Sequence, residues 1–281
     1  MIELYYLTIC TLGESPNLEI CLQKLLDIKA NTKENVEILL VLNTEEGHKI
    51  FDSRIIVRYE GIKGYSSVRN KAISEVPQNA NLIFLDDDEI PTESWFNALV
   101  NKHREYPDDV IFGPVLPELG SEPSSYRNQF KKEYESLTDN SIVRQAGVGN
   151  MLIPSSLLHR GLVKFDPFYN SSGSEDTDLS FRLRKQGVKI RFAKQAIIYE
   201  KQGNERHQNY YLESRYIKDI ANYSVVIRRN SKLTRKIWRF STLTLRILFY
   251  TLISTVNSKF LLQRRAYITS MRAFVAGELI N

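Results

Sequence analysis

Short apolar runs alternate with amphipathic segments along the first half of the chain. The runs Ile2–Cys10, Val36–Leu42 and Leu82–Leu85 each suit a buried strand. Between them, apolar residues recur at helical spacing in Leu18–Leu26 and Ser66–Val76. This alternation predicts an α/β fold with a mainly parallel central sheet flanked by helices on both faces.

The same pattern continues further along the chain. Val110–Leu116 and Gly147–Ile153 are predicted to be strands, and Glu93–His103 is predicted to be a helix. Residues 118–144 are polar and predict an excursion over the surface, with one helix near Tyr126–Glu135. A chain of 281 residues has room for one large α/β domain and an appendage, or for two small domains.

An acidic stretch follows the strand Leu82–Leu85. Four carboxylates, Asp86, Asp87, Asp88 and Glu89, stand where the strand leaves the core. An unpaired buried carboxylate costs several kcal/mol, so this cluster needs either water or cations. Ligands of open α/β sheets bind at the carboxyl ends of the strands, which is where the cluster would lie. By itself, a solvated acidic loop explains the stretch equally well.

A second acidic stretch begins a predicted helix at residues 173–179. Ser174 is a candidate N-cap, three acids fall in the first turn, and Gly187 ends the helix. Acids in a first turn complement the helix dipole, and taken alone this structural explanation is favoured.

Charge is distributed unevenly along the chain. Between Ile220 and Gly277 there are eleven Lys and Arg and no acid. Residues 1–219 therefore have a net charge of −5, although the net charge of the whole chain is +5. We therefore predict a domain at residues 1–215 and a basic, amphipathic helical region at residues 216–281. Two cysteines give no disulfide framework and favour a reducing compartment. Because the sequence begins with a strand-like run, we expect no signal peptide. The four scattered histidines give no zinc-ligand spacing.

Taken together, these stretches resemble the family 2 glycosyltransferases of the GT-A fold. The resemblance covers residues 2–215 and, within the family, points to bacterial enzymes that build surface polysaccharides. Two positions depart from the family pattern, because Leu42-Asn43 stands where an Asp pair is common and Glu200 where a His is common. The motifs that carry the resemblance are Thr11, Asn43, Arg69-Asn70, Asp86-Asp87-Asp88 and Gly173–Leu179, in the family's order.

The resemblance implies a function and a set of site residues. It implies inverting transfer of a sugar from a nucleotide-diphosphate donor, a UDP-sugar, to a glycan or lipid-linked acceptor. Asp88 would ligate Mg²⁺ or Mn²⁺, and Asp86 would contact the donor ribose or the water shell of the metal. Asp176 would be the general base, ionised and weakened by its helix N-terminus, with Glu175 positioning the acceptor. The expected donor-binding residues are Thr11, Glu14, Asn43, Arg69, Asn70, Asp86 and Asp87, and Arg69 can equally pair with the acidic cluster.

The basic C-terminal region leaves two interpretations open. Leu243–Val256 is too short to cross a bilayer, and Trp238, Phe240, Leu243, Ile247 and Phe249 suit a helix in the headgroup region of an anionic membrane. The protein would then be cytoplasmic and peripheral on the inner face of the plasma membrane. Alternatively, the apolar face packs on the catalytic domain or on a second subunit.

Other functions and contacts remain as weaker alternatives. A sugar-nucleotide pyrophosphorylase would need a basic, Gly-rich loop where Thr11-Leu12-Gly13-Glu14 stands. A non-enzymatic membrane- or nucleic-acid-binding protein would leave both acidic stretches unexplained, and no nucleic-acid motif accompanies the basic residues. In the transferase interpretation, a loop containing Arg206 and His207 can close over the donor phosphates, although an ordinary surface loop is slightly favoured.

Overall fold

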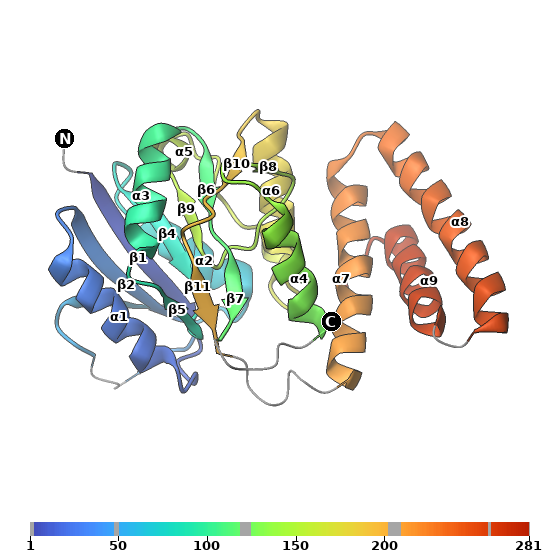
Figure 1. Ribbon diagram of the computed structural model, residues 1–281, viewed down its shortest axis with the longest axis horizontal. Helices are drawn as coiled ribbons and strands as arrows, with labels where there is room; N and C mark the ends of the chain where they lie inside the picture. The colour runs from blue at the N-terminus through green and yellow to red at the C-terminus, as the bar shows by residue number, and fades with distance from the viewer. Residues whose placement is uncertain (1–2, 48–50, 119–124, 202–208, 258–259, 281) are drawn as a thin grey trace.

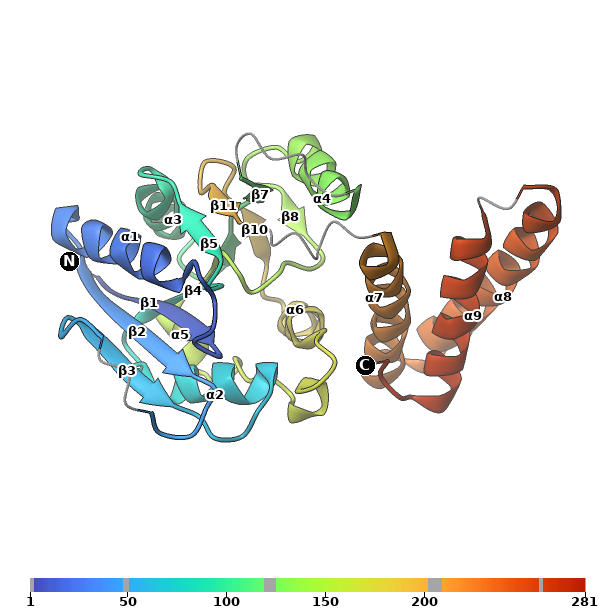
Figure 2. The same cartoon turned by 90° about the horizontal axis from the view of Figure 1, so that it is seen from below.

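An eight-stranded sheet forms the centre of the molecule (Figures 1 and 2). The computed structural model describes residues 3–47, 51–118, 125–201, 209–257 and 260–280. Within these ranges the strand order is β3-β2-β1-β4-β9-β6-β10-β8, and β5, β11 and β7 form a second, small sheet. The strands are β1 Leu4–Thr11, β2 Asn35–Leu42, β3 Ile55–Tyr59, β4 Asn81–Leu85, β5 Glu89–Pro91, β6 Val110–Phe112, β7 Val115–Pro117, β8 Ile142–Val143, β9 Met151–Ile153, β10 Ile190–Phe192 and β11 Ile198–Glu200.

The central sheet is mainly parallel, as predicted. Strands β3, β2, β1 and β4 run parallel to one another, β10 runs parallel to β6, and β9 and β8 run antiparallel to their neighbours. The helices are α1 Leu18–Asn31, α2 Tyr65–Glu75, α3 Trp95–Glu105, α4 Ser125–Ser136, α5 Ser155–His159, α6 Glu175–Lys185, α7 Asn209–Asn230, α8 Leu233–Val256 and α9 Leu261–Ala276, with a 3-10 turn η1 at Pro167–Tyr169.

Helices cover both faces of the sheet because successive strand residues point to opposite sides. Tyr5, Leu7 and Ile9 of β1 pack with the apolar faces of α1 and α3. Tyr6 of β1, with alternate residues of β2 and β4, packs on the opposite face with α2, α5 and α6. The α1 face follows the predicted spacing, since Leu18, Cys21, Leu22, Leu25 and Leu26 are all buried.

Two predicted strands were wrong in their extent. Val110–Leu116 is divided into β6 and β7, which belong to different sheets. The break falls at Gly113-Pro114, where a Cβ on Gly113 would lie only 2.1 Å from the carbonyl oxygen of Ala196. The strand predicted from Gly147 begins only at Met151, because Asn150 adopts a left-handed conformation with φ of 63°.

The last three helices form a bundle beside the α/β body (Figures 1 and 2). Helix α9 packs against both α7 and α8, and α7 contacts α6 and α4 of the body. Helix α7 begins at Asn209, so the predicted division between residues 215 and 216 falls inside this helix. That division stays a prediction. Across the described residues, no helix has both the length and the apolar character needed to span a membrane.

Candidate active site

The loop after β1 and the acidic stretch after β4 are joined by their side chains. The parallel register of β1 with β4 brings Thr11 level with Asp87, and Thr11 Oγ1 donates a hydrogen bond to Asp87 Oδ2. The backbone N–H of Gly13 donates to Thr11 Oγ1 at 2.8 Å, and Ser15 Oγ donates to the carbonyl of Asp87 at 3.1 Å. Glu14 lies exposed on the same loop. Thr11 and Asp87 therefore hold two strand ends together.

Two predicted donor-binding amides brace the backbone. Asn43 Nδ2 donates to the carbonyls of Glu60 and Ile62, and its Oδ1 accepts from the N–H of Gly64, each at 2.8 Å. Asn70 makes a reciprocal pair of 2.8 Å hydrogen bonds with the backbone of Phe165. These bonds use both donor hydrogens of Asn43 and fix the loop that precedes α2.

Arg69 connects the two acidic stretches. It projects from α2, with its Nη1 bonded to Glu175 Oε1 and its Nη2 3.6 Å from Asp86 Oδ1. The Arg69 and Glu175 side chains are only 11% and 6% exposed. Burial alone would lower the pKa of Arg69, but Glu175 and then Asp86 raise it, so the guanidinium keeps its charge. The acidic stretches after β4 and at the start of α6 are therefore parts of one site.

Two buried glutamates, one on β5 and one on β11, lie next to the acidic stretch. Glu89 on β5 and Glu200 on β11 are paired across the strands, and both side chains are buried. Glu89 Oε2 accepts a 2.8 Å hydrogen bond from the N–H of Asp86, while the backbone N–H of Lys201 donates to the carbonyl of Asp88 at 3.0 Å. Burial, reinforced by the charge of Asp86, raises the pKa of Glu89 well above its usual range.

Glycines line the path between the acidic stretches. A Cβ on Gly149 would lie 2.5 Å from Glu89 Oε1 and 3.0 Å from Asp86 Oδ2. A Cβ on Gly147 would lie 3.9 Å from Asp176 Oδ2. The segment before β9 thus passes beside carboxylates of both stretches, and Gly149 lets Glu89 and Asp86 approach the backbone more closely than a side chain would allow.

The predicted direction of the pKa shift of Asp176 was wrong. Burial, together with the charge of Glu175, raises the pKa of Asp176 to about 7. Arg69 and hydrogen bonds from Thr177, whose N–H donates to Asp176 Oδ1 at 2.6 Å, oppose that rise without cancelling it. A helix N-terminus is worth only about 0.3–1 kcal/mol at an exposed site, so burial next to a second carboxylate outweighs it.

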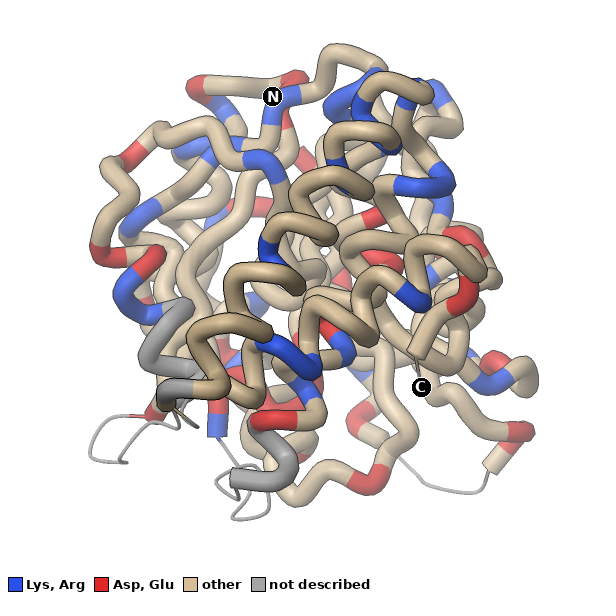
Figure 3. The backbone as a smooth tube through the Cα atoms, turned by 90° about the vertical axis from the view of Figure 1, so that its right-hand side faces the viewer, with Lys and Arg blue, Asp and Glu red and all other residues tan. Residues whose placement is uncertain are grey.

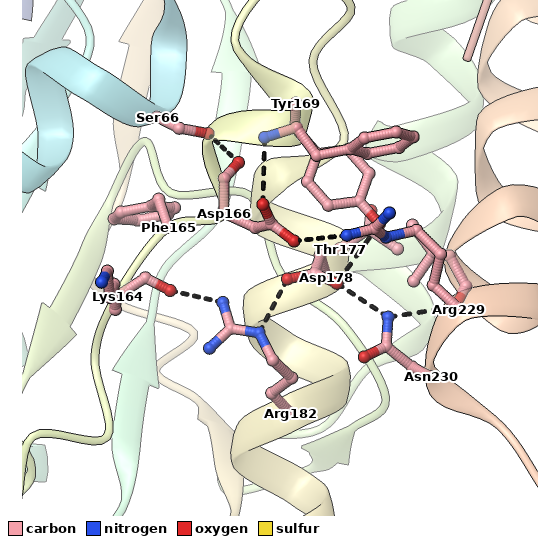
Figure 4. Close-up of polar contacts among 12 residues, drawn as sticks. Ser66, Lys164, Phe165, Asp166, Tyr169, Thr177, Asp178, Arg182, Arg229 and Asn230 are labelled. Atoms are coloured by element: carbon pink, nitrogen blue, oxygen red, sulfur yellow. Dashed lines mark hydrogen bonds and ion pairs between the residues drawn. The ribbon is translucent and has the colours of Figure 1, made fainter. Parts of the chain in front are cut away.

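Side-chain hydrogen bonds, one of them from the end of α7, hold the start of α6, whereas the side chain of its N-cap residue makes no capping hydrogen bond. Ser174 is the N-cap residue, but it adopts a left-handed conformation and its side chain makes no capping hydrogen bond. Instead, Asp178 Oδ1 accepts from Asn230 Nδ2 at 2.7 Å, and Asp178 Oδ2 accepts from Arg182 Nε at 2.7 Å (Figure 4). Arg229 donates to Asp166 Oδ2 at 2.7 Å. The C-terminal end of α7 therefore clamps the helix that carries Glu175 and Asp176.

Sequence reasoning missed several residues of this site. Glu89 was grouped with the acidic stretch and given no role. It stands two residues before Pro91 in β5, so both side chains lie on the same, buried side of the strand, and this spacing could have indicated an inward side chain. Gly149 and Asn230 carried no signal, because their partners lie far away in sequence. The loop containing Arg206 and His207 lies outside the described residues.

The described residues include no side-chain group that could bind a metal ion without further ligands. In the part of the chain that the structure describes, no three His, Cys, Asp or Glu side chains form a cluster able to hold a metal ion. Any cation at this edge of the sheet would need further ligands from a bound molecule or from water.

The arrangement defines a class of protein. Parallel strands whose ends carry Thr11, Asn43 and the Asp86–Asp88 run, facing a carboxylate-bearing helix, make a GT-A type of α/β fold. The sequence profile described as "Glycosyl transferase family 2" matches residues 6–160, more than half of the chain. The chain therefore belongs to this family.

Comparison with solved structures agrees with this fold. A crystal structure of GalNAc-T7 with UDP, GalNAc and Mn²⁺ matches with a TM-score of 0.58 at 15% sequence identity. The match covers 81% of this chain and 48% of that chain, so the chain spans about half the length of GalNAc-T7 in that structure. A search of curated proteins found no match.

Proposed function

We propose that the protein is an inverting, metal-dependent glycosyltransferase that uses a nucleotide-diphosphate sugar, in the first instance a UDP-sugar. Arg69 carries the proposal, because it links Asp86 of the acidic stretch to Glu175 beside Asp176. Family membership supports transfer over the pyrophosphorylase and non-enzymatic alternatives. The UDP and Mn²⁺ in the GalNAc-T7 structure support testing that nucleotide and that metal first.

Asp88 and Asp86 are the proposed ligands of Mg²⁺ or Mn²⁺. Such an ion commonly takes one or two protein carboxylates and completes its shell with substrate phosphates and water, so a two-carboxylate site fits. The chemistry of these side chains supports the fit, since carboxylate oxygens are the hard ligands that such an ion prefers and the Asp86 side chain is 49% exposed. When bound, the cation would neutralise charge on the departing diphosphate.

Asp176 is the proposed general base. The acceptor hydroxyl oxygen would form its bond to the anomeric carbon as Asp176 takes the hydroxyl proton and the bond to the diphosphate breaks. Attack from the face opposite the diphosphate inverts the anomeric configuration. A pKa of about 7 supports this role, because a base works best when its pKa lies near the working pH.

Glu175 is proposed to orient the acceptor. Its Oε1 is bound by Arg69, whereas its Oε2 is buried and has no hydrogen-bond partner among the described residues. A buried acceptor atom without a donor is costly, and an acceptor hydroxyl would satisfy it. Arg69 would thus position Glu175, in addition to balancing the charge of Asp86.

The remaining donor contacts are proposed for the ends of β1, β2 and β4. Glu14, Thr11 and Asp87 would line the base and ribose pocket, with Thr11 and Asp87 shaping it through their mutual hydrogen bond. Asn43 and Asn70 would act mainly by holding the surrounding backbone. The acceptor would be a glycan or lipid-linked saccharide of a surface polysaccharide, and the reaction would take place at the cytoplasmic face of the plasma membrane.

Calorimetric titration of UDP-sugars and other nucleotide sugars, with Mn²⁺ or with EDTA, tests the proposal. We expect donor binding that requires the metal and that falls by roughly tenfold or more in Asp88→Asn. Asp27→Asn, which changes an exposed carboxylate of α1, is the matched control and should bind like the wild type.

Two results would contradict the proposal. Equal donor affinity in Mn²⁺ and in EDTA would show that donor binding does not require a metal ion. If no nucleotide sugar binds the folded protein, the donor is not a nucleotide sugar.

A further inference from the structure

The outer face of α8 exposes large apolar side chains over most of its length. We define this face by six residues that are between 55% and 73% exposed: Ile237, Trp238, Leu245, Leu248, Phe249 and Leu252. Their spacing of three, four and seven residues places them on one side of the helix. Exposed apolar patches of this kind usually mark a surface that binds something.

The opposite side of α8 is anchored within the protein. Leu243 is fully buried and packs with Ile227, Tyr267 and Phe274 of α7 and α9. Arg239 is also buried and donates to Ser224 Oγ at 2.7 and 3.1 Å. The helix is therefore held by one face, and turning it to bury the other would break these contacts.

This geometry divides the apolar residues that the sequence had grouped together. Leu243 faces inward and Ile247 packs at the edge of the same cluster, whereas Trp238, Phe240 and Phe249 are exposed. The predicted packing of an apolar face is confirmed for one side of α8, although its partners are α7 and α9, and the predicted membrane contact stays a prediction. One face of α8 packs on the protein, and a second apolar face remains outside.

Charge distinguishes between the two possible occupants of this face. Helix α8 contains Lys and Arg but no Asp or Glu (Figure 3). Two exposed cations belong to this helix and its cap, with Lys232 as the N-cap residue and Arg246 inside the helix. A second copy would bring two regions of eleven positive charges together, which costs energy, whereas an anionic surface would be attracted.

We propose that the outer face of α8 docks on an anionic phospholipid bilayer, with the helix lying in the plane of the interface. Apolar side chains including Trp and Phe would enter the boundary between headgroups and acyl chains, and the exposed cations would contact anionic headgroups. This inference adds an attachment surface to the proposed function and does not depend on the transfer chemistry.

The two tryptophans allow a direct test. Trp238 is 62% exposed, whereas Trp95 is fully buried and donates to Asn150 Oδ1 at 2.7 Å. Fluorescence of the full chain is measured with vesicles of phosphatidylcholine alone and with about one third phosphatidylglycerol, at low and high salt. With anionic vesicles at low salt, Trp238 emission should shift to the blue, and in Trp238→Phe the remaining Trp95 emission should not move.

Sedimentation with the same vesicles tests the face as a whole. Leu245→Glu/Leu248→Glu should lower vesicle affinity by about tenfold or more. Ile62→Glu is the matched control, because Ile62 is 67% exposed but lies in the body, and it should bind like the wild type. High salt should weaken binding by screening the exposed cations.

Three outcomes would overturn the inference. The first is that the protein does not bind anionic vesicles. The second is that the Leu245→Glu/Leu248→Glu variant binds vesicles as tightly as the wild type. The third is that the wild type sediments as a dimer in ultracentrifugation whereas this variant sediments as a monomer. The assays contain no donor sugar, so any of these would leave the proposed transfer reaction standing. Conversely, an inactive enzyme that still binds vesicles would leave the docking surface standing.

Discussion

The body and the C-terminal helices place charge and apolar surface in opposite ways. In the body, Arg69 and Glu175 form an ion pair that is almost wholly buried, and the apolar side chains of the sheet are covered by helices. In α8, the six apolar side chains that define the outer face are exposed, and the helix contains Lys and Arg but no acid. Buried charge is typical of a site built for chemistry, and exposed apolar surface is typical of a site built for attachment.

The buried ion pair should give the largest change in stability. Arg69→Met would leave Glu175 buried without its cation, and breaking such a pair costs about 3–5 kcal/mol of the free energy of unfolding. Urea denaturation measures the change, with Arg54→Met as control because its pair with Asp52 is exposed and should matter little. Equal stability of both variants would show that the body does not depend on its buried charges.

The pH dependence of transfer should reflect Asp176. Because its pKa is raised to about 7 and a base must be deprotonated, kcat/KM should fall below pH 7, by about tenfold per pH unit. Glu175→Gln removes a charge that raises the pKa of Asp176, so the midpoint should move to lower pH. A profile that is flat from pH 5 to pH 8 would contradict the assignment.

The contact between the two regions should have an intermediate effect. Asn230→Ala removes a hydrogen bond to the carboxylate of Asp178, worth about 1.5 kcal/mol of the free energy of unfolding. Asn97→Ala, at an exposed position in α3, is the matched control. A larger loss of kcat than of stability would show that α7 also holds the start of α6 in its working position.

The smallest effect on stability is expected at the outer face of α8. Leu245→Glu should change the free energy of unfolding by no more than about 0.5 kcal/mol, because Leu245 is 66% exposed. Urea denaturation of this variant without vesicles provides the measurement. A loss of several kcal/mol would mean that this face is covered within the protein.

Much of the fold was predictable because it depends on local patterns. Alternating strands and helices indicated the parallel sheet, and the carboxyl ends of β1 and β4 meet as expected. The division of Val110–Leu116 was not predictable, because it depends on the close approach of Ala196 to Gly113. An apolar run does not reveal that its two halves join different sheets.

The site was predictable in its motifs but not in its electrostatics. The dipole of α6 can be recognised in the sequence, whereas the burial of Asp176 and the position of Arg69 come from the tertiary fold. Likewise, an Asn after a strand looks the same whether it binds a ligand or braces the backbone, as Asn43 does. Long-range partners therefore decide what each residue of the motif does.

Turnover and donor affinity of Asp176→Asn, measured on the same preparation, test the central claim most directly. We expect transfer to fall by about 10²–10⁴-fold while the Kd for the nucleotide sugar stays unchanged, since the base acts only on the acceptor proton. Wild-type turnover in this variant would contradict the account.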